Sequence, residues 1–255
     1  MTDDHRVVVA DTEGVRLVAF DRPEVRNAFD RAMYEQVTAA LVDAAGDDAV
    51  RVVVLTGTGT AFTSGQDLRE MAAIATGTAP PGAEKAFTGL LDALGGFAKP
   101  LLAAVNGVGL GLGCTILGHV DIALIDEGAR LRVPFAELGV PPEAASSLLF
   151  PRRMGWQRAA SVLLASEWLD ADGAVAAGLA LRVCPAGTVV AETTALATRI
   201  ASFPPEAVRE VKRLMVAATG DEIVEARRRE DAAFAALFRD AGRNPGAALA
   251  DARKG

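Results

Sequence analysis

The chain has 255 residues, of which 51% are hydrophobic and 23% are charged, and its formal net charge is −7 at pH 7. This length is enough for one sizeable hydrophobic core, or for a main domain with a small appendage, and the composition is ordinary for a soluble globular protein. The negative balance excludes an overall basic surface, so neither nucleic acid nor an anionic membrane is expected as a partner.

The cysteines and the N-terminus indicate the compartment. The chain has two cysteines, Cys114 and Cys184, which predicts a reducing compartment and no disulfide framework. The polar, acidic first residues lack the apolar centre of a secretory signal, and no uninterrupted apolar run has the length of a membrane span. We therefore expect a cytoplasmic protein.

Apolar runs of strand length alternate with stretches of helical spacing over the first two thirds of the chain. In chain order, the predicted strands cover residues 6–10, 15–20, 51–56, 101–105, 121–125 and 130–133. The predicted helices, the first of them capped by Asp30, cover residues 31–45, 84–97, 156–165, 171–177, 188–202, 205–217 and 221–240. This order predicts an α/β fold of βαβ units, and the shift towards helix formers after about residue 186 predicts a C-terminal helical appendage.

Residues 100–115 contain the most distinctive motif. A buried strand is followed by glycines at 107, 109, 111 and 113, and then by an apolar helix start. Such a turn directs free backbone N–H groups at one point, which suits a phosphate or a reaction oxyanion. Neither the G-x-G-x-x-G spacing nor a Walker lysine is present, so these nucleotide-binding motifs are excluded. Close packing of strand against helix remains the alternative.

A second glycine turn, at residues 62–68, follows the predicted strand 51–56. Two turns at strand ends, each with an exposed N–H group, are what a two-donor oxyanion hole requires. An ordinary turn glycine explains this segment equally well.

Carboxylates are the best candidates for proton transfer. The two histidines, His5 and His119, do not suggest a nucleophilic triad, and His119 is expected to be structural. Cys114 is expected to be a small core residue. No metal site is expected. Glu143 follows two prolines and precedes small residues that leave room for a substrate. The alternative is a first-turn glutamate stabilised by a helix dipole. Glu137 and Asp67 are weaker candidates, and Asp67 is equally suited to a local cap.

Taken together, these segments resemble the crotonase, or enoyl-CoA hydratase/isomerase, superfamily over roughly residues 7 to 218. The marks of the resemblance are Asp21-Arg-Pro-x-x-x-Asn-Ala-Phe29, Ala61-Phe-Thr-Ser-Gly-Gln-Asp-Leu68, Lys99-Pro-Leu-Leu-Ala-Ala-Val-Asn-Gly107 with its glycine continuation, Asp121, and Ala174-Val-Ala-Ala-Gly-Leu179. Each is weak alone, but in this order and at this spacing they are highly specific.

The resemblance implies a crotonase-like α/β spiral of repeated ββα units over residues 1–190, with a helical oligomerisation region over residues 191–255. It also implies a homotrimer or hexamer that acts on acyl-CoA thioesters in fatty acid metabolism and needs no cofactor beyond the CoA of the substrate. The backbone N–H groups of Gln66 and Leu112 match the family's oxyanion hole. The implied substrate-binding residues are Arg26, Ala28, Ser64, Asp67, Leu68 and Gly111.

Two departures from the family's hydratases point to the reaction. The resemblance places catalytic glutamates of hydratases where this chain has Thr115 and Phe135, whereas Glu143 matches the single base of peroxisomal-type Δ3,Δ2-enoyl-CoA isomerases. It therefore implies an isomerase. Hydration, thioester hydrolysis or decarboxylation through Glu143 or Glu137, and a non-catalytic acyl-CoA-binding protein, remain alternatives; a nicotinamide-dependent oxidoreductase is disfavoured.

Three further segments carry weaker expectations. Residues 75–83 look mobile and are expected to shape the acyl pocket. Lys212 is a candidate for the CoA 3′-phosphate, with a plain surface lysine as the safer interpretation. The charged run at residues 227–231 predicts a solvated helix face or a subunit contact.

Overall fold

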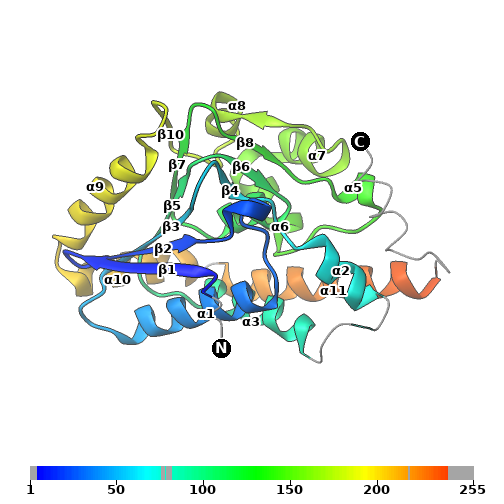
Figure 1. Cartoon of the computed structure of the whole chain (residues 1–255), viewed down its shortest axis with the longest axis horizontal. Helices are drawn as coiled ribbons and strands as arrows, with labels where there is room; N and C mark the ends of the chain where they lie inside the picture. Colours follow the sequence, from blue (N-terminus) through cyan, green and yellow to red (C-terminus); the bar gives the residue numbers. More distant parts are fainter. Residues whose placement is uncertain (1–4, 76–77, 79–81, 218, 241–255) are drawn as a thin grey trace.

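Two β-sheets organise the residues that the computed structural model describes, which are 5–75, 78, 82–217 and 219–240 (Figure 1). The larger sheet has the order β1-β2-β3-β5-β7-β10, and the smaller has the order β4-β6-β8-β9. The larger sheet contains β1 (Val7–Thr12), β2 (Val15–Phe20), β3 (Val52–Gly57), β5 (Leu101–Val105), β7 (Ile122–Asp126) and β10 (Arg182–Cys184). The smaller contains β4 (Ala61–Thr63), β6 (Val108–Leu110), β8 (Arg130–Arg132) and β9 (Leu169–Asp170).

Helices cover both faces of the larger sheet and make up most of the second half of the chain. They are α1 (Arg31–Gly46), α2 (Leu68–Ala75), α3 (Ala83–Gly95), α4 (Leu112–Thr115), α5 (Phe135–Leu138), α6 (Ser146–Met154), α7 (Trp156–Leu164), α8 (Ala171–Ala176), α9 (Val189–Ala201), α10 (Pro205–Ala217) and α11 (Gly220–Asp240), with the 3-10 turns η1 (Pro23–Val25) and η2 (Ile116–Gly118). Within the described residues, no helix is both long enough and apolar enough to cross a bilayer.

The larger sheet is parallel apart from its first hairpin. β1 and β2 pair antiparallel through a turn in which Glu13 and Gly14 both have positive φ, and β2, β3, β5, β7 and β10 then run parallel. Because parallel strands end at the same edge, the loops after β2, β3 and β5 gather at one edge of the sheet.

Alternating side chains on the strands create two cores. In β3, Val53 and Leu55 face the core that contains α1 and α3, whereas Val52 and Val54 pack with α9 on the opposite face. This two-residue period is what a strand buried on both faces requires, and it explains the β-branched run in the sequence. The sheet therefore lies between α9 and the helices α1 and α3 (Figure 1).

The smaller sheet continues the larger one. After each of β3, β5 and β7 the chain turns and forms a short strand, β4, β6 or β8, before the next helix. Gly107 lies at one such corner, where a Cβ atom would lie 2.1 Å from the carbonyl oxygen of Thr60, so that only glycine fits. The chain thus repeats a ββα unit, as expected.

The six predicted strands and seven predicted helices are all present, with ends shifted by a few residues. The strands β4, β6, β9 and β10 and the helices α2, α5 and α6 were not expected, whereas β8 matches the predicted strand 130–133 and α4 matches the helix start predicted after the glycines. The unexpected elements are short, so their hydrophobic period is not established over enough residues. Much of the segment 75–83, expected to be mobile, lies outside the described residues.

Candidate active site

The loop after β2 is fastened to the turn after β3 by a buried asparagine. Asn27 is fully buried and has a positive φ of 57°. Its Nδ2 donates to the carbonyl oxygens of Thr58 and Ala61, each at 2.9 Å, and its Oδ1 accepts from Arg22 N–H at 2.9 Å. After glycine, asparagine is among the residues that tolerate this left-handed backbone conformation best.

Replacing Asn27 with alanine is expected to lower the free energy of unfolding by roughly 2–4 kcal/mol, because buried carbonyl groups lose their donor and alanine disfavours positive φ. Asn27→Gly loses the same bonds without the backbone strain and should cost less. Chemical denaturation measures both, with Glu24→Ala in the same loop as an exposed control. Equal stability of Asn27→Ala and the wild type would contradict this role.

Arg22 joins three acidic and carbonyl groups in the same region. Its guanidinium lies 3.3 Å from Asp30 and 3.2 Å from Asp67, and it donates to the carbonyl oxygen of Ala28 at 2.6 Å. Asp67 also accepts from Arg69 N–H at 2.9 Å, which is the local cap considered from the sequence. Asp67 therefore has a structural role in holding the two loops together.

The Gln66 N–H is left free by the way its strand pairs. Phe29 and Gln66 form an isolated parallel bridge, in which Phe29 N–H donates to Gly65 O and Asp67 N–H donates to Phe29 O, both at 2.8 Å. Because successive peptide groups of an extended strand point to opposite sides, the N–H of Gln66 points away from Phe29. Among the described residues, no acceptor binds it.

Leu112 N–H is the second free donor. Leu112 is the first residue of α4, so its N–H has no acceptor within the helix. A Cβ atom built on Gly65 would lie 3.4 Å from Leu112 N, which places the Gln66 turn directly beside the start of α4. Gly111, which precedes Leu112, has φ 51° and open space at its Cα.

The other glycines of this motif serve packing. A Cβ atom would lie 2.1 Å from Thr60 O at Gly107 and 2.6 Å from Thr63 O at Gly113. The close-packing alternative is therefore correct for these positions, whereas Gly111 leaves access to a free N–H. Spacing alone could not separate the two uses.

Glu143 lies on the loop before α6, and its side chain is partly exposed. Within the described residues, its carboxylate takes part in no hydrogen bond or ion pair. Burial, and to a lesser extent the negative charge of Glu230, raise the pKa of Glu143 to about 7. A carboxylate with this pKa is a suitable base near neutral pH. Because α6 begins at Ser146, Glu143 is not the first-turn glutamate considered from the sequence.

The two residues after Glu143 are strained. Ala144 and Ala145 have φ of 57° and 56°, in the left-handed region that disfavours a Cβ atom. His119 Nε2 lies 2.8 Å from Ala144 O, so this nitrogen carries the proton, since a carbonyl oxygen only accepts. Burial lowers the pKa of His119 to about 4, so the ring is neutral at pH 7. His119 is structural, as predicted.

The remaining predicted residues lie around these loops. Ser64 donates to Val25 O at 3.1 Å, Arg26 is exposed with φ 55°, and Leu68 is an exposed residue at the start of α2. Glu137 is exposed and ion-paired to Arg132, which distinguishes it from the unpaired Glu143. Cys114 is fully buried, and burial raises the pKa of its thiol to about 12, as suits a small core residue.

Tyr34 and Glu230 were missed from the sequence. Tyr34 is buried against Phe29, with ring centroids 5.1 Å apart, and its hydroxyl has no partner among the described residues. Burial and the negative charge of Glu143 raise the pKa of Tyr34, which places the phenol near that carboxylate. The helical spacing after Asp30 did not single out Tyr34. Nothing in that pattern indicated that its hydroxyl is unpaired.

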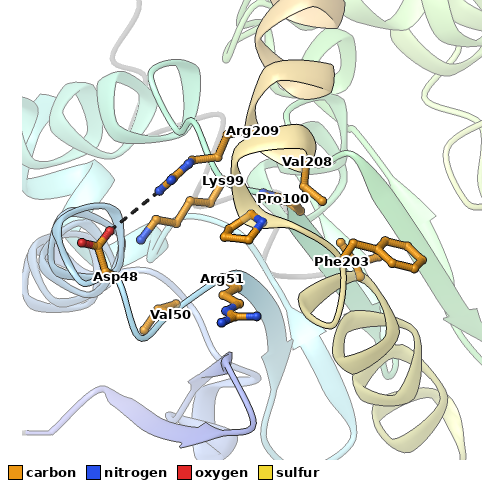
Figure 2. A pocket seen from close by; sticks show the side chains of 10 residues that line it. Asp48, Val50, Arg51, Lys99, Pro100, Phe203, Val208 and Arg209 are labelled. Atoms are coloured by element: carbon orange, nitrogen blue, oxygen red, sulfur yellow. Dashed lines mark ion pairs between the residues drawn. The ribbon is translucent and has the colours of Figure 1, made fainter.

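A small cavity lies away from these loops, where β3 and β5 begin (Figure 2). It is bordered by Val50, Lys99, Pro100 and Arg209 among others, and its volume of about 20 Å³ holds roughly one water molecule. It is therefore no site for a substrate.

The interpretation of Lys212 as a surface lysine is wrong, whereas its contact with the CoA 3′-phosphate stays a prediction. Lys212 is buried, and its ammonium binds Lys99 O at 2.6 Å and Asp121 at 2.9 Å. These two partners hold the lysine inside the protein because a buried ammonium needs hydrogen-bond acceptors.

Comparison with known proteins gives consistent matches along the chain. A sequence model of the enoyl-CoA hydratase/isomerase family matches residues 10–253. The chain is 35% identical to rat enoyl-CoA delta isomerase 2 over 212 residues, which is 82% of this chain and 54% of the rat protein. It is also 33% identical to 2,3-dehydroadipyl-CoA hydratase of Escherichia coli over 82% of this chain and 81% of that protein. The chain thus spans about half the length of the rat relative.

Solved structures agree with the architecture. A crystal structure of an enoyl-CoA hydratase/isomerase from Pseudoalteromonas atlantica has a TM-score of 0.87 and 34% identity, with 93% of each chain covered. Pseudomonas aeruginosa OdaA has a TM-score of 0.90 and 34% identity, with 97% of this chain and 98% of that chain covered. The predicted crotonase-like α/β fold with a C-terminal helical region is confirmed. The chain belongs to the enoyl-CoA hydratase/isomerase family.

Proposed function

We propose that this protein is an acyl-CoA-processing enzyme, a Δ3,Δ2-enoyl-CoA isomerase that uses Glu143 as its only base. The observation that carries the proposal is the unpaired Glu143, with a pKa of about 7, on a chain with two free N–H donors side by side. Isomerisation by a proton shift needs one base and one oxyanion hole, and it needs no activated water.

The reaction begins with a 3-enoyl-CoA whose thioester oxygen accepts hydrogen bonds from Gln66 N–H and Leu112 N–H. Glu143 removes a proton from C2, and the electron pair of that C–H bond spreads over the oxygen and C4 as a dienolate. The two N–H groups stabilise the negative charge that develops on the oxygen. The protonated Glu143 then returns its proton to C4, which leaves the double bond between C2 and C3.

Residues at two hydratase positions favour isomerisation over hydration. The two positions hold Thr115, which is fully buried, and Phe135, which is almost fully buried in the core. Because neither side chain is a carboxylate, neither can serve as a second base that activates water. The rat relative is named as an enoyl-CoA delta isomerase, which supports the same choice.

Hydration is the second candidate, because the Escherichia coli relative is named as a hydratase at similar identity. It requires a water molecule activated by Glu143 alone. Thioester hydrolysis, decarboxylation or plain acyl-CoA binding would use the same donors, but none has a specific observation in its favour.

Substrate contacts beyond the reacting atoms are part of the same proposal. Arg26 and the Ala28 backbone lie in the loop after β2, and Ser64, Asp67, Leu68 and Gly111 lie in or next to the two donor turns. Of these, Arg26 and Leu68 have exposed side chains, and Gly111 has open space at its Cα. We assign them to the CoA and acyl portions of the substrate.

A homotrimer or hexamer is proposed for the assembled protein, with residues 191–255 contributing to subunit contacts. Exposed large apolar side chains on α7 and α10 support this assembly, since such side chains commonly mark protein interfaces. They are Trp156, Leu164, Val211, Leu214 and Met215.

The proposal is tested by incubating the purified protein separately with a 3-enoyl-CoA and with a 2-enoyl-CoA. We expect conversion of the 3-enoyl ester to the 2-enoyl ester, and no water addition to the 2-enoyl ester. Hydration without isomerisation would replace the proposal with the second candidate. Binding of both esters without turnover would identify a non-catalytic member.

A further inference from the structure

The C-terminal helix α11 packs against the start of α6, directly after Glu143. Ile223 and Ala226 of α11 contact a small buried cluster that contains Ala145 and Leu149. These two residues and Glu230 lie three and four positions apart, so they share one face of the helix (the long orange helix in Figure 1). This face could have been found in the sequence, where Glu230 is hidden in the charged run 227–231.

Glu230 is the charged member of that face, and its side chain binds the loop. It is only 6% exposed. Its two carboxylate oxygens accept hydrogen bonds from Ala145 N–H at 2.7 Å and from Ser147 N–H at 2.9 Å. The residue before α6 provides no cap from its own side chain, so Glu230 supplies from a distant helix the acceptor that a helix start requires.

The loop bound by Glu230 has an unfavourable backbone conformation. Ala144 and Ala145 both have positive φ, and such a conformation persists only where surrounding contacts impose it. His119 binds Ala144 O from one side, and Glu230 binds Ala145 N–H and Ser147 N–H from the other. Glu143 immediately precedes the residues that these hydrogen bonds hold, so the bonds set the direction in which its side chain leaves the backbone.

We propose that Glu230 is a positioning residue that holds the Glu143 carboxylate in its reactive place through the backbone of residues 144–147. This inference rests on the proposed role of Glu143 as the base. It gives the C-terminal helix a part in the reaction that goes beyond subunit contacts. Within the charged run 227–231, Arg228 and Arg229 are exposed to solvent, whereas Glu230 is buried against the loop.

The negative charge of Glu230 also affects the pKa of Glu143. Glu230 from α11 and Tyr34 from α1 interact electrostatically with Glu143, the neutral His119 after η2 binds the next residue, Ala144, and Arg227 lies near His119. Among them, Glu230 raises the pKa of Glu143 by placing a second negative charge nearby. Removing that charge therefore lowers the pKa of Glu143 and moves the acidic limb of the rate profile to lower pH.

The test compares Glu230→Gln with Glu222→Gln in the full-length protein. Glu222 lies on the same helix and forms an exposed ion pair with Arg152 of α6, at 2.5 Å, without touching the loop. For Glu230→Gln we expect kcat to fall roughly 10- to 100-fold with little change in KM, because the base is displaced while substrate contacts remain. We also expect the acidic limb of the pH–rate profile to move to lower pH. Glu222→Gln should change neither quantity, and equal behaviour of the two variants would overturn the proposal.

A second measurement does not depend on turnover. Carbon-13 NMR of glutamate-labelled protein, with the Glu143 signal assigned from Glu143→Gln, gives the pKa of Glu143 directly. It should be lower in Glu230→Gln than in Glu222→Gln, and an unchanged value would refute the role of Glu230. If Glu230→Gln folds poorly, Ala145→Gly is added to both proteins, because glycine relieves the positive φ. Full activity of Glu143→Gln would instead refute the proposed base, whatever the titration shows.

Discussion

Replacing Glu143 with glutamine is expected to lower kcat for isomerisation by about 10⁴-fold and to leave binding of the acyl-CoA ester nearly unchanged. Glutamine has almost the same shape, but it cannot accept the C2 proton or deliver one to C4, and general acid–base groups contribute up to roughly this factor. Initial rates with a 3-enoyl-CoA measure kcat, and calorimetric titration with a non-reacting acyl-CoA measures binding. Glu137→Gln is the matched control, because Glu137 is an exposed glutamate of the preceding helix that pairs with Arg132.

The pH dependence of the wild type belongs to the same prediction. The base must be ionised, and its pKa is raised to about 7. Below about pH 7 the protonated fraction grows, so kcat/KM should fall about tenfold for each pH unit, and above pH 7 it should level off. A profile that is flat down to pH 5, or an unchanged rate in Glu143→Gln, would remove Glu143 from the mechanism.

Replacing Leu112 with proline is expected to lower kcat by about 10²- to 10³-fold, equivalent to roughly 3–4 kcal/mol of transition-state stabilisation. Proline has no backbone N–H, so one of the two proposed oxyanion donors is lost. The first residue of a helix is the position that accepts proline best, because its N–H has no acceptor within the helix. The backbone around α4 is therefore expected to keep its course.

Leu112→Ala is the control that isolates the N–H. Both variants lose the buried leucine side chain, and both should be less stable by roughly 2–5 kcal/mol. Alanine keeps the donor, so Leu112→Ala should retain most of the wild-type kcat under conditions in which both proteins are folded. Equal kcat values for the two variants would exclude Leu112 N–H as an oxyanion donor. Thermal unfolding of both proteins establishes the temperature for this comparison.

Much of the architecture follows from local patterns in the sequence. The β-branched run of β3 alternates between two cores, and the apolar spacing after Asp30 produces α1, whose first turn Asp30 caps at 2.9 Å. These signals are local, since hydrophobic period and capping depend on neighbouring residues. The strands β4, β6 and β9 of the smaller sheet lack such a signal because they have only two or three residues each.

The free N–H groups depended on contacts between distant segments. The sequence placed Gln66 and Leu112 in two glycine turns, but a turn does not reveal which N–H groups find acceptors. The bridge between Phe29 and the Gln66 turn occupies the groups on either side of Gln66 and leaves its own N–H unpaired. That pairing joins residues far apart in the chain.

The identity of the candidate base was available from the sequence, whereas its setting was decided by the tertiary structure. Glu143, the two prolines before it and the small residues after it are a local motif, and matching it to a family needs no coordinates. Its raised pKa depends on burial and on Glu230, a residue 87 positions later on another helix. The backbone strain at Ala144 and Ala145 is likewise held by His119 and Glu230. Electrostatic fields and hydrogen bonds act through space, so the sequence by itself determines the acid and the fold decides its strength and direction.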